Sequence, residues 1–242
     1  MASRLANRHI ELNAQLRDST VKRLTRIWRS LPEYRDETLP AWLNAAVPVV
    51  QAAQRAEITI TQAYLSRALG RTVRAVSAEE IMAMSRNGTP PADVYSLPFG
   101  EVWSALAGGA TFDQAQERGL FRATQTAATD IQATMRDTLN VVGEAEPDLW
   151  GYQRVTDGAA CSFCLLLNGA QFRTDDPMPI HPNCGCGVEP VVYTRGFDNR
   201  NNLATFNASP TPPPKGVAVR DHGELGPVLG DPSQNFTTAA DI

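Results

Sequence analysis

Residues 150–193 read WGYQRVTDGAACSFCLLLNGAQFRTDDPMPIHPNCGCGVEPVVY, and this stretch decides how the rest of the chain is interpreted. It contains all four cysteines of the protein and one of its three histidines: Cys161, Cys164, His181, Cys184 and Cys186. Their spacing is C-x2-C, a connecting segment, and then H-x2-C-x-C. Paired thiols can direct two sulfurs to one point, and a second cluster of soft ligands completes a tetrahedron around zinc. The sequence therefore predicts a structural Zn2+ site, with five candidate ligands for four positions.

Other uses of these cysteines fit the sequence less well. Two disulfides are typical of small secreted domains, whereas this chain has 242 residues, four cysteines and no apolar signal segment. A thioredoxin-like redox pair needs a C-x-x-C beside a βαβ pattern, which the sequence does not show. A catalytic zinc keeps one coordination position open, so a surplus of ligands favours a closed structural site.

The composition is that of an ordinary globular protein, with 43% hydrophobic and 20% charged residues. No apolar run is long enough to span a bilayer, and no membrane association is expected. The net charge of −4 and a pI near 5.4 argue against a protein that coats nucleic acid with its whole surface.

Charge is nevertheless distributed unevenly along the chain. Residues 1–35 carry eight Arg or Lys against three acids, and 8 − 3 gives +5. A solvated helix face is the commoner explanation, and DNA contact through this basic helix is the functional alternative. Residues 150–193 carry two arginines against four acids, and 2 − 4 gives −2. A phosphate-binding surface should be positive, which argues against a nucleic-acid-binding zinc module.

Upstream of the cysteine block, apolar periodicity and helix punctuation predict a mainly helical region. Helices are expected at 11–31, 40–70, 77–87, 98–108 and 111–142. Ser77 and Thr111 each begin a capping-box pattern, and Gly70 is a natural C-terminal cap. We expect Pro48 to kink or delay the second helix and Gly119 to interrupt the last one.

After residue 147 the pattern predicts short strands at 152–155, 171–173 and 188–193. So few strands are marginal alone, and zinc would supply folding free energy on the order of 10 kcal/mol. From residue 199 onward the chain is Pro-rich, and its apolar islands are expected to be disordered or to order on a partner. The predicted class is α+β: a helical region (1–110), a long helix with a zinc-stapled β unit (111–198), and an extended C-terminal arm (199–242).

These residues resemble a known family. The shared features are Arg122-Ala123-Thr124 near the start of the long helix, then Asp157, Cys161-x-x-Cys164, Gly169, His181-Pro182-Asn183-Cys184-Gly185-Cys186 and Pro190. In this order they resemble the Mu F-like family of minor head, or head morphogenesis, proteins of tailed bacteriophages. The resemblance covers residues 112–193. Members often carry a basic residue between the last two cysteines, where this chain has Gly185.

The resemblance implies a virion protein bound at the portal vertex inside the head and made in the host cytoplasm. Its implied partners are the phage portal protein and, secondarily, the major capsid or scaffold protein. Its implied role is structural, in head assembly and in DNA packaging or delivery.

A capsid maturation protease is the main rival, because some proteins in that genomic position are catalogued as such. A Ser or Cys protease needs a nucleophile beside a general base, usually a histidine. His181 and the cysteines are better used by the metal, His9 lies near a terminus expected to fray, and His222 lies in a tail expected to lack a scaffold. No G-x-S-x-G or H-E-x-x-H motif is present. The sequence therefore assigns no catalytic residue.

Overall fold

The computed structural model describes residues 3–158, 160, 164–165, 167–181, 184–192, 218–222 and 224–230. Its helical elements are α1 (Arg4–Arg29), α2 (Leu39–Leu69), α3 (Ala78–Met84), the 3-10 turn η1 (Ser85–Gly88), α4 (Pro91–Ala107) and α5 (Phe112–Ala145). Its strands are β1 (Leu149–Val155), β2 (Gln171–Arg173), β3 (Gly187–Val192), β4 (Ala218–His222) and β5 (Gly226–Gly230). A mainly helical N-terminal region followed by a small β unit is thus confirmed.

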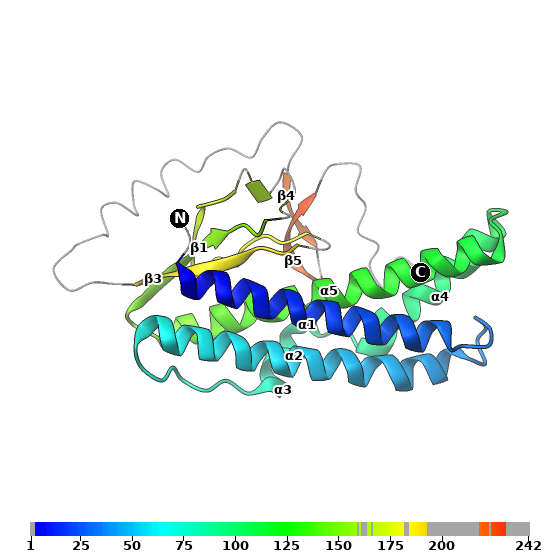
Figure 1. The fold of residues 1–242 in the computed structure, drawn as a ribbon, viewed down its shortest axis with the longest axis horizontal. Coiled ribbons are helices and arrows are strands. Elements are labelled where there is room, and N and C mark those ends of the chain that lie inside the picture. Colours follow the sequence, from blue (N-terminus) through cyan, green and yellow to red (C-terminus); the bar gives the residue numbers. More distant parts are fainter. Residues whose placement is uncertain are drawn as a thin grey trace.

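The long helices α1, α2 and α5 lie lengthwise beside one another, and the strands gather over the N-terminal part of α1 (Figure 1). Helix α4 packs along α5. None of the described helices is long and apolar enough to cross a bilayer.

Local capping signals set several helix ends as the sequence predicts. The Ser77 side chain accepts a hydrogen bond from the backbone N–H of Glu80 at the start of α3. Thr111 and Gln114 form a complete capping box at the start of α5. Gly70 ends α2 in the left-handed conformation, with φ +68°.

Helix α1 begins at Arg4 rather than at residue 11. The Ser3 side chain caps it by accepting a hydrogen bond from the Ala6 backbone N–H, and Ala6 and Ile10 are buried on the same side as the later apolar residues. The expectation that His9 lies near a frayed terminus is therefore wrong, because its side chain is only 2% exposed.

His9 belongs to a buried polar layer between α1 and α2. Its ring stacks on Tyr64 with centroids 4.2 Å apart, and its Nε2 lies 3.3 Å from Thr61 Oγ1. The Thr61 hydroxyl donates to Glu57 Oε1 at 2.9 Å. Burial lowers the pKa of His9 to about 4 and raises the pKa of Glu57 to about 7, because both charged forms lose their hydration. His9 is consequently neutral near neutral pH, and Glu57 keeps its proton to a much higher pH than an exposed carboxyl does.

The far end of the helical body is organised around Trp28. Its ring meets Trp42 and Phe99 edge-on, at centroid distances of 5.1 and 5.6 Å. Gly119 lies against this cluster: a Cβ there would come within 2.5 Å of Trp28 Cζ2 and 2.6 Å of Val102 Cγ2. Gly119 therefore permits a close helix crossing, and the expectation that it interrupts α5 is wrong.

The prolines act differently from the sequence expectation. Helix α4 begins at Pro91 rather than at Pro98, which lies inside it. Pro48 does not delay α2, which runs without interruption from Leu39. Both inner prolines lie close to buried apolar residues: Phe99, next to Pro98, is 0% exposed, and Val50, two residues after Pro48, is 2% exposed. This packing outweighs the backbone hydrogen bond that each proline removes.

The β unit is a small antiparallel sheet with β1 in the centre, in the order β2-β1-β3. Its strands coincide closely with the predicted ones. Met135, Leu139 and Val142 on α5 share one apolar core with Tyr152 of β1 and Val188 of β3. Helix α5 thus covers one face of the sheet, as a marginal sheet requires.

The C-terminal region contains an element that the sequence did not indicate. Strands β4 and β5 form an antiparallel hairpin, and Val228 of β5 forms a parallel bridge with Ile180. Leu225 and Val228 are 3% and 1% exposed within the core that covers the β unit. These two apolar residues, expected to be disordered or to dock on a partner, are buried within the same chain.

Candidate metal centre

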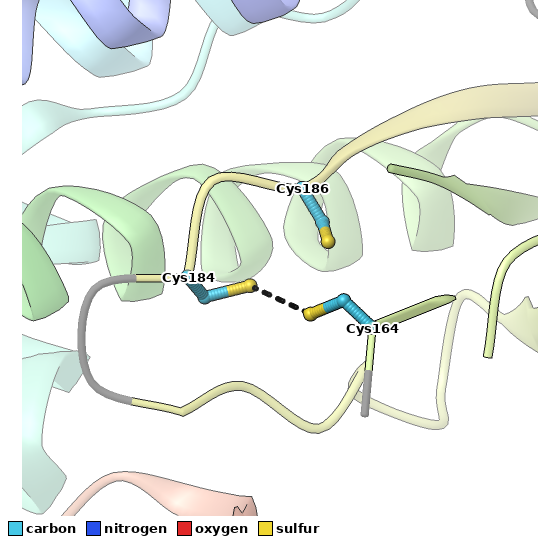
Figure 2. A group of neighbouring side chains, drawn as sticks. All are labelled: Cys164, Cys184 and Cys186. Carbon is cyan, nitrogen blue, oxygen red and sulfur yellow. Dashed lines mark hydrogen bonds between the residues drawn. The ribbon is translucent and has the colours of Figure 1, made fainter. Parts of the chain in front are cut away.

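Three cysteine side chains from two separate segments converge in the β unit. Cys164 follows β1, whereas Cys184 and Cys186 lie just before β3. Their sulfur atoms all lie within 4.8 Å of one another, and each residue is at most 2% exposed. Figure 2 shows the three side chains directed toward one another. The Cys164 and Cys184 sulfurs lie 3.9 Å apart.

This spacing fits a shared metal ion better than a disulfide. A Zn–S bond of about 2.3 Å and tetrahedral angles place two bound sulfurs about 3.8 Å apart. The observed separation of 3.9 Å agrees with that value. A disulfide would need about 2.05 Å, and all three described cysteines are free thiols. The cluster can therefore supply three corners of a tetrahedral site.

His181 offers a fourth donor atom. Its Nε2 lies 3.0 Å from the Cys164 sulfur. A nitrogen and a sulfur bound to one zinc would be about 3.5 Å apart, so this pair would have to separate by about half an ångström to share the ion. The remaining candidate, Cys161, lies outside the described residues. The structure thus brings together three of the five predicted ligands as one cluster and places the His181 ring beside one of them, Cys164.

Two glycines let the second ligand segment pass close to its neighbours. A Cβ on Gly185 would meet Asp157 Oδ2 at 1.9 Å, and a Cβ on Gly187 would meet Ile10 Cγ1 at 2.4 Å. Asp157 fills the space beside Gly185, so a larger residue at that position would require the segment to move.

Three helices hold the backbone around Cys184 and Cys186. Arg17 of α1 donates to the Cys184 carbonyl oxygen. Gln132 of α5 donates to the Cys186 carbonyl oxygen at 2.7 Å. The Tyr64 hydroxyl of α2 donates to the Val188 carbonyl oxygen, also at 2.7 Å. Sequence reasoning missed these contacts, because each comes from an element far away in the chain. They join the candidate metal centre to the helical body.

Arg154 of β1 is the charged residue closest to the sulfurs. Its side chain is fully buried, and its Nη1 lies 3.4 Å from the Cys164 sulfur and 3.9 Å from the Cys184 sulfur. Hydrogen bonds from the Cys164 and Cys186 thiols lower the pKa of Cys184 well below its usual range, and Arg154 acts in the same direction. The same coupling raises the pKa of Cys164 and of Cys186, so among these three thiols the site favours negative charge on the Cys184 sulfur.

A second buried polar cluster joins the hairpin to the helices. Arg86 of η1 pairs through Nε with Asp130 Oδ1 at 2.6 Å and through Nη1 with Glu224 Oε2 at 3.1 Å. The Tyr95 hydroxyl donates to Asp130 Oδ2 at 2.7 Å. Because the charged and polar groups of this cluster pair with one another, we interpret it as a structural link between the hairpin and the helices.

The histidines considered for a protease lie in three separate environments. His9 is buried under Tyr64, and His181 lies beside the cysteines. His222 is the last residue of β4, so the expectation that it lacks a scaffold is wrong, although its side chain lies outside the described part.

Fold and site together define a helical protein with a small β unit built around a cysteine cluster that could bind a metal ion. Residues 1–207 match the family model described as VG15 protein, and the chain belongs to this family. The family is one of viral gene products, in agreement with a bacteriophage protein. No curated protein and no solved structure matches the chain.

Proposed function

We propose that the protein is a minor capsid, or head morphogenesis, protein of a tailed bacteriophage, bound at the portal vertex inside the head. The observation that carries this proposal is a long helix, α5, whose C-terminal half is buried and which is followed directly by the cysteine–histidine β unit, in a chain that belongs to a viral family. The Mu F-like resemblance covers the same elements, residues 112–193.

The role that we assign to the cysteine cluster is structural. Cys164, Cys184, Cys186 and His181 would hold Zn2+, which supplies four directional bonds without redox chemistry. Arg17 of α1 and Gln132 of α5 donate hydrogen bonds to the carbonyl oxygens of Cys184 and Cys186. These bonds would connect an ordered metal site to the two helices. The β unit would then stay rigidly attached to the helices when a partner binds.

DNA contact through α1 is a secondary part of the proposal. Lys22, Arg23 and Arg26 are exposed and form no ion pair with any described residue. Replacing all three with alanine should weaken binding to duplex DNA and reduce its dependence on salt concentration, because each phosphate contact releases counterions. Arg8→Ala is the matched control, since Arg8 already pairs with Glu11 at 3.0 Å. If the triple alanine variant and Arg8→Ala bind duplex DNA equally well, the proposed DNA contact of α1 is wrong.

Association with the portal is tested by co-expression with the portal protein encoded by the same phage genome. The two proteins should co-purify and co-migrate in gel filtration, and mass spectrometry of purified virions should detect the chain. A Cys164→Ser variant tests whether the metal-stapled unit is needed for the complex. Absence of the chain from virions, together with no portal complex, would contradict the proposal.

A further inference from the structure

The guanidinium of Arg154 is buried without an acidic partner. Arg154 is 1% exposed, its Nη2 donates to the Pro179 carbonyl oxygen, and its Nε has no hydrogen-bond partner among the described residues. Among the described residues no carboxylate forms an ion pair with it. A buried charge is costly unless a counter-charge lies close by. In the described part of the chain, the groups in position to provide one are the sulfurs of Cys164, Cys184 and Cys186.

Four ligands chosen from the five candidates give one set of four cysteines and four sets of three cysteines with His181, and the charge of Arg154 distinguishes these two kinds of set. Four thiolates around Zn2+ carry 2 − 4 = −2, whereas three thiolates and one neutral imidazole carry 2 − 3 = −1. When the +1 charge of Arg154 is added, the buried net charge is −1 for four thiolates and zero for three thiolates with imidazole. A low-dielectric interior favours the neutral assembly.

The other charges beside the site do not change this comparison. Arg17 and Asp157 both reach Gly185, where a Cβ would meet Asp157 Oδ2 at 1.9 Å and Arg17 Nη2 at 3.2 Å. Lying together, these opposite charges offset each other. Arg154 therefore remains the net counter-charge of the centre.

We propose that the metal ligands are Cys164, His181, Cys184 and Cys186, that Arg154 is their counter-charge, and that Cys161 is the spare cysteine. The assignment rests on the zinc centre of the proposed function. Geometry supports it independently, because the His181 Nε2 already lies 3.0 Å from the Cys164 sulfur. Pro179, which Arg154 binds through its carbonyl, lies two residues before His181. Arg154 thus both balances the thiolate charge and positions the segment that carries the histidine.

Cobalt substitution tests the ligand set. Co2+ takes the tetrahedral positions of Zn2+, and its sulfur-to-metal charge-transfer absorption increases with each thiolate bound. Wild type and Cys161→Ser should give the same three-thiolate spectrum, and His181→Ala should change the ligand-field bands. His181→Cys should add the intensity of a fourth thiolate. A loss of one thiolate in Cys161→Ser, with an unchanged spectrum in His181→Ala, would overturn the assignment. Failure of the wild type itself to bind cobalt or zinc would overturn the metal centre as well.

The role of Arg154 is tested by zinc competition with a chelating dye. Arg154→Gln removes the charge and should weaken zinc binding about 10- to 100-fold, the usual cost of losing a residue that supports metal ligands. Arg154→Lys keeps the charge and should recover much of that loss. The matched control is Arg173→Gln in the same sheet, because Arg173 is exposed and pairs only with Asp175. Equal zinc affinity of Arg154→Gln and Arg173→Gln would refute the counter-charge role.

Discussion

Replacing Glu224 with glutamine should loosen the C-terminal hairpin without disturbing the helices. Glu224 lies in the turn between β4 and β5, and its Oε2 lies 3.1 Å from Arg86 Nη1. Arg86 in turn holds Asp130 of α5 at 2.6 Å. The Glu224→Gln side chain keeps nearly the same shape but loses the negative charge.

The magnitude follows from the burial of the pair. The side chains of Arg86 and Glu224 are only 11% and 10% exposed, so solvent screens their attraction weakly. A hydrogen bond to a charged group contributes about 1.5–3 kcal/mol. Because Arg86 keeps its pairing with Asp130, no charge is left alone, and the lower part of that range, about 1.5–2 kcal/mol, applies. This corresponds to a roughly 10- to 30-fold increase in opening of the hairpin. Leu225 and Val228 remain buried and keep it docked most of the time.

Hydrogen exchange read by mass spectrometry measures this opening directly. Peptides that span residues 218–230 should exchange faster in Glu224→Gln than in wild type, while peptides from α5 should not change. Glu33→Gln is the control, because its pair with Arg35 is exposed and should contribute less than about 1 kcal/mol. Identical exchange of the hairpin in wild type and Glu224→Gln would refute the reasoning.

Two further substitutions test the helical body. Gly119→Ala should lower the free energy of unfolding by about 1–3 kcal/mol, because the added methyl meets Trp28 and Val102, and urea titration should show this loss. Gly158→Ala, with open space around its Cβ, should leave the urea midpoint unchanged, and equal effects would contradict the packing argument. Burial raises the pKa of Glu57 from 4.5 to about 7, so between these values the folded state keeps a proton that the unfolded state has released, and stability falls as pH rises. As pH rises from 4.5 to 7, Glu57→Gln should therefore become more stable relative to wild type, by about 3 kcal/mol at most. A difference in unfolding free energy that does not change with pH would contradict the raised pKa of Glu57.

Helix ends could be predicted from the sequence where their cause is local. Ser77, Thr111 and Gly70 act through hydrogen bonds or backbone conformations within one turn, and all three predictions are confirmed. Pro98 and Gly119 were misjudged because their effect depends on a distant partner. Gly119 fits α5 only because Trp28 of α1 lies against it, and spacing along α5 does not contain that information.

The candidate site likewise has features that could be predicted from the sequence and features that could not. Motif spacing predicted the candidate ligands, and the three described sulfurs among them do converge. It did not identify Arg154, Arg17 or Gln132, which are single polar residues in a strand or in helices and become neighbours of the cysteines only in the folded chain. The hairpin was missed because Leu225 and Val228 are too isolated to form a periodic pattern, and their burial depends on contacts with residues far away in the sequence.

The central claim, that a metal ion fastens the β unit to the helical body, is tested most directly by measuring metal content together with local stability. Protein purified without chelator should contain one zinc per chain by elemental analysis and native mass spectrometry. Removing that zinc should speed hydrogen exchange in β1 and β3 while α2 stays protected. Protein that contains no metal, with β1 and β3 nevertheless protected as strongly as α2, would contradict the account.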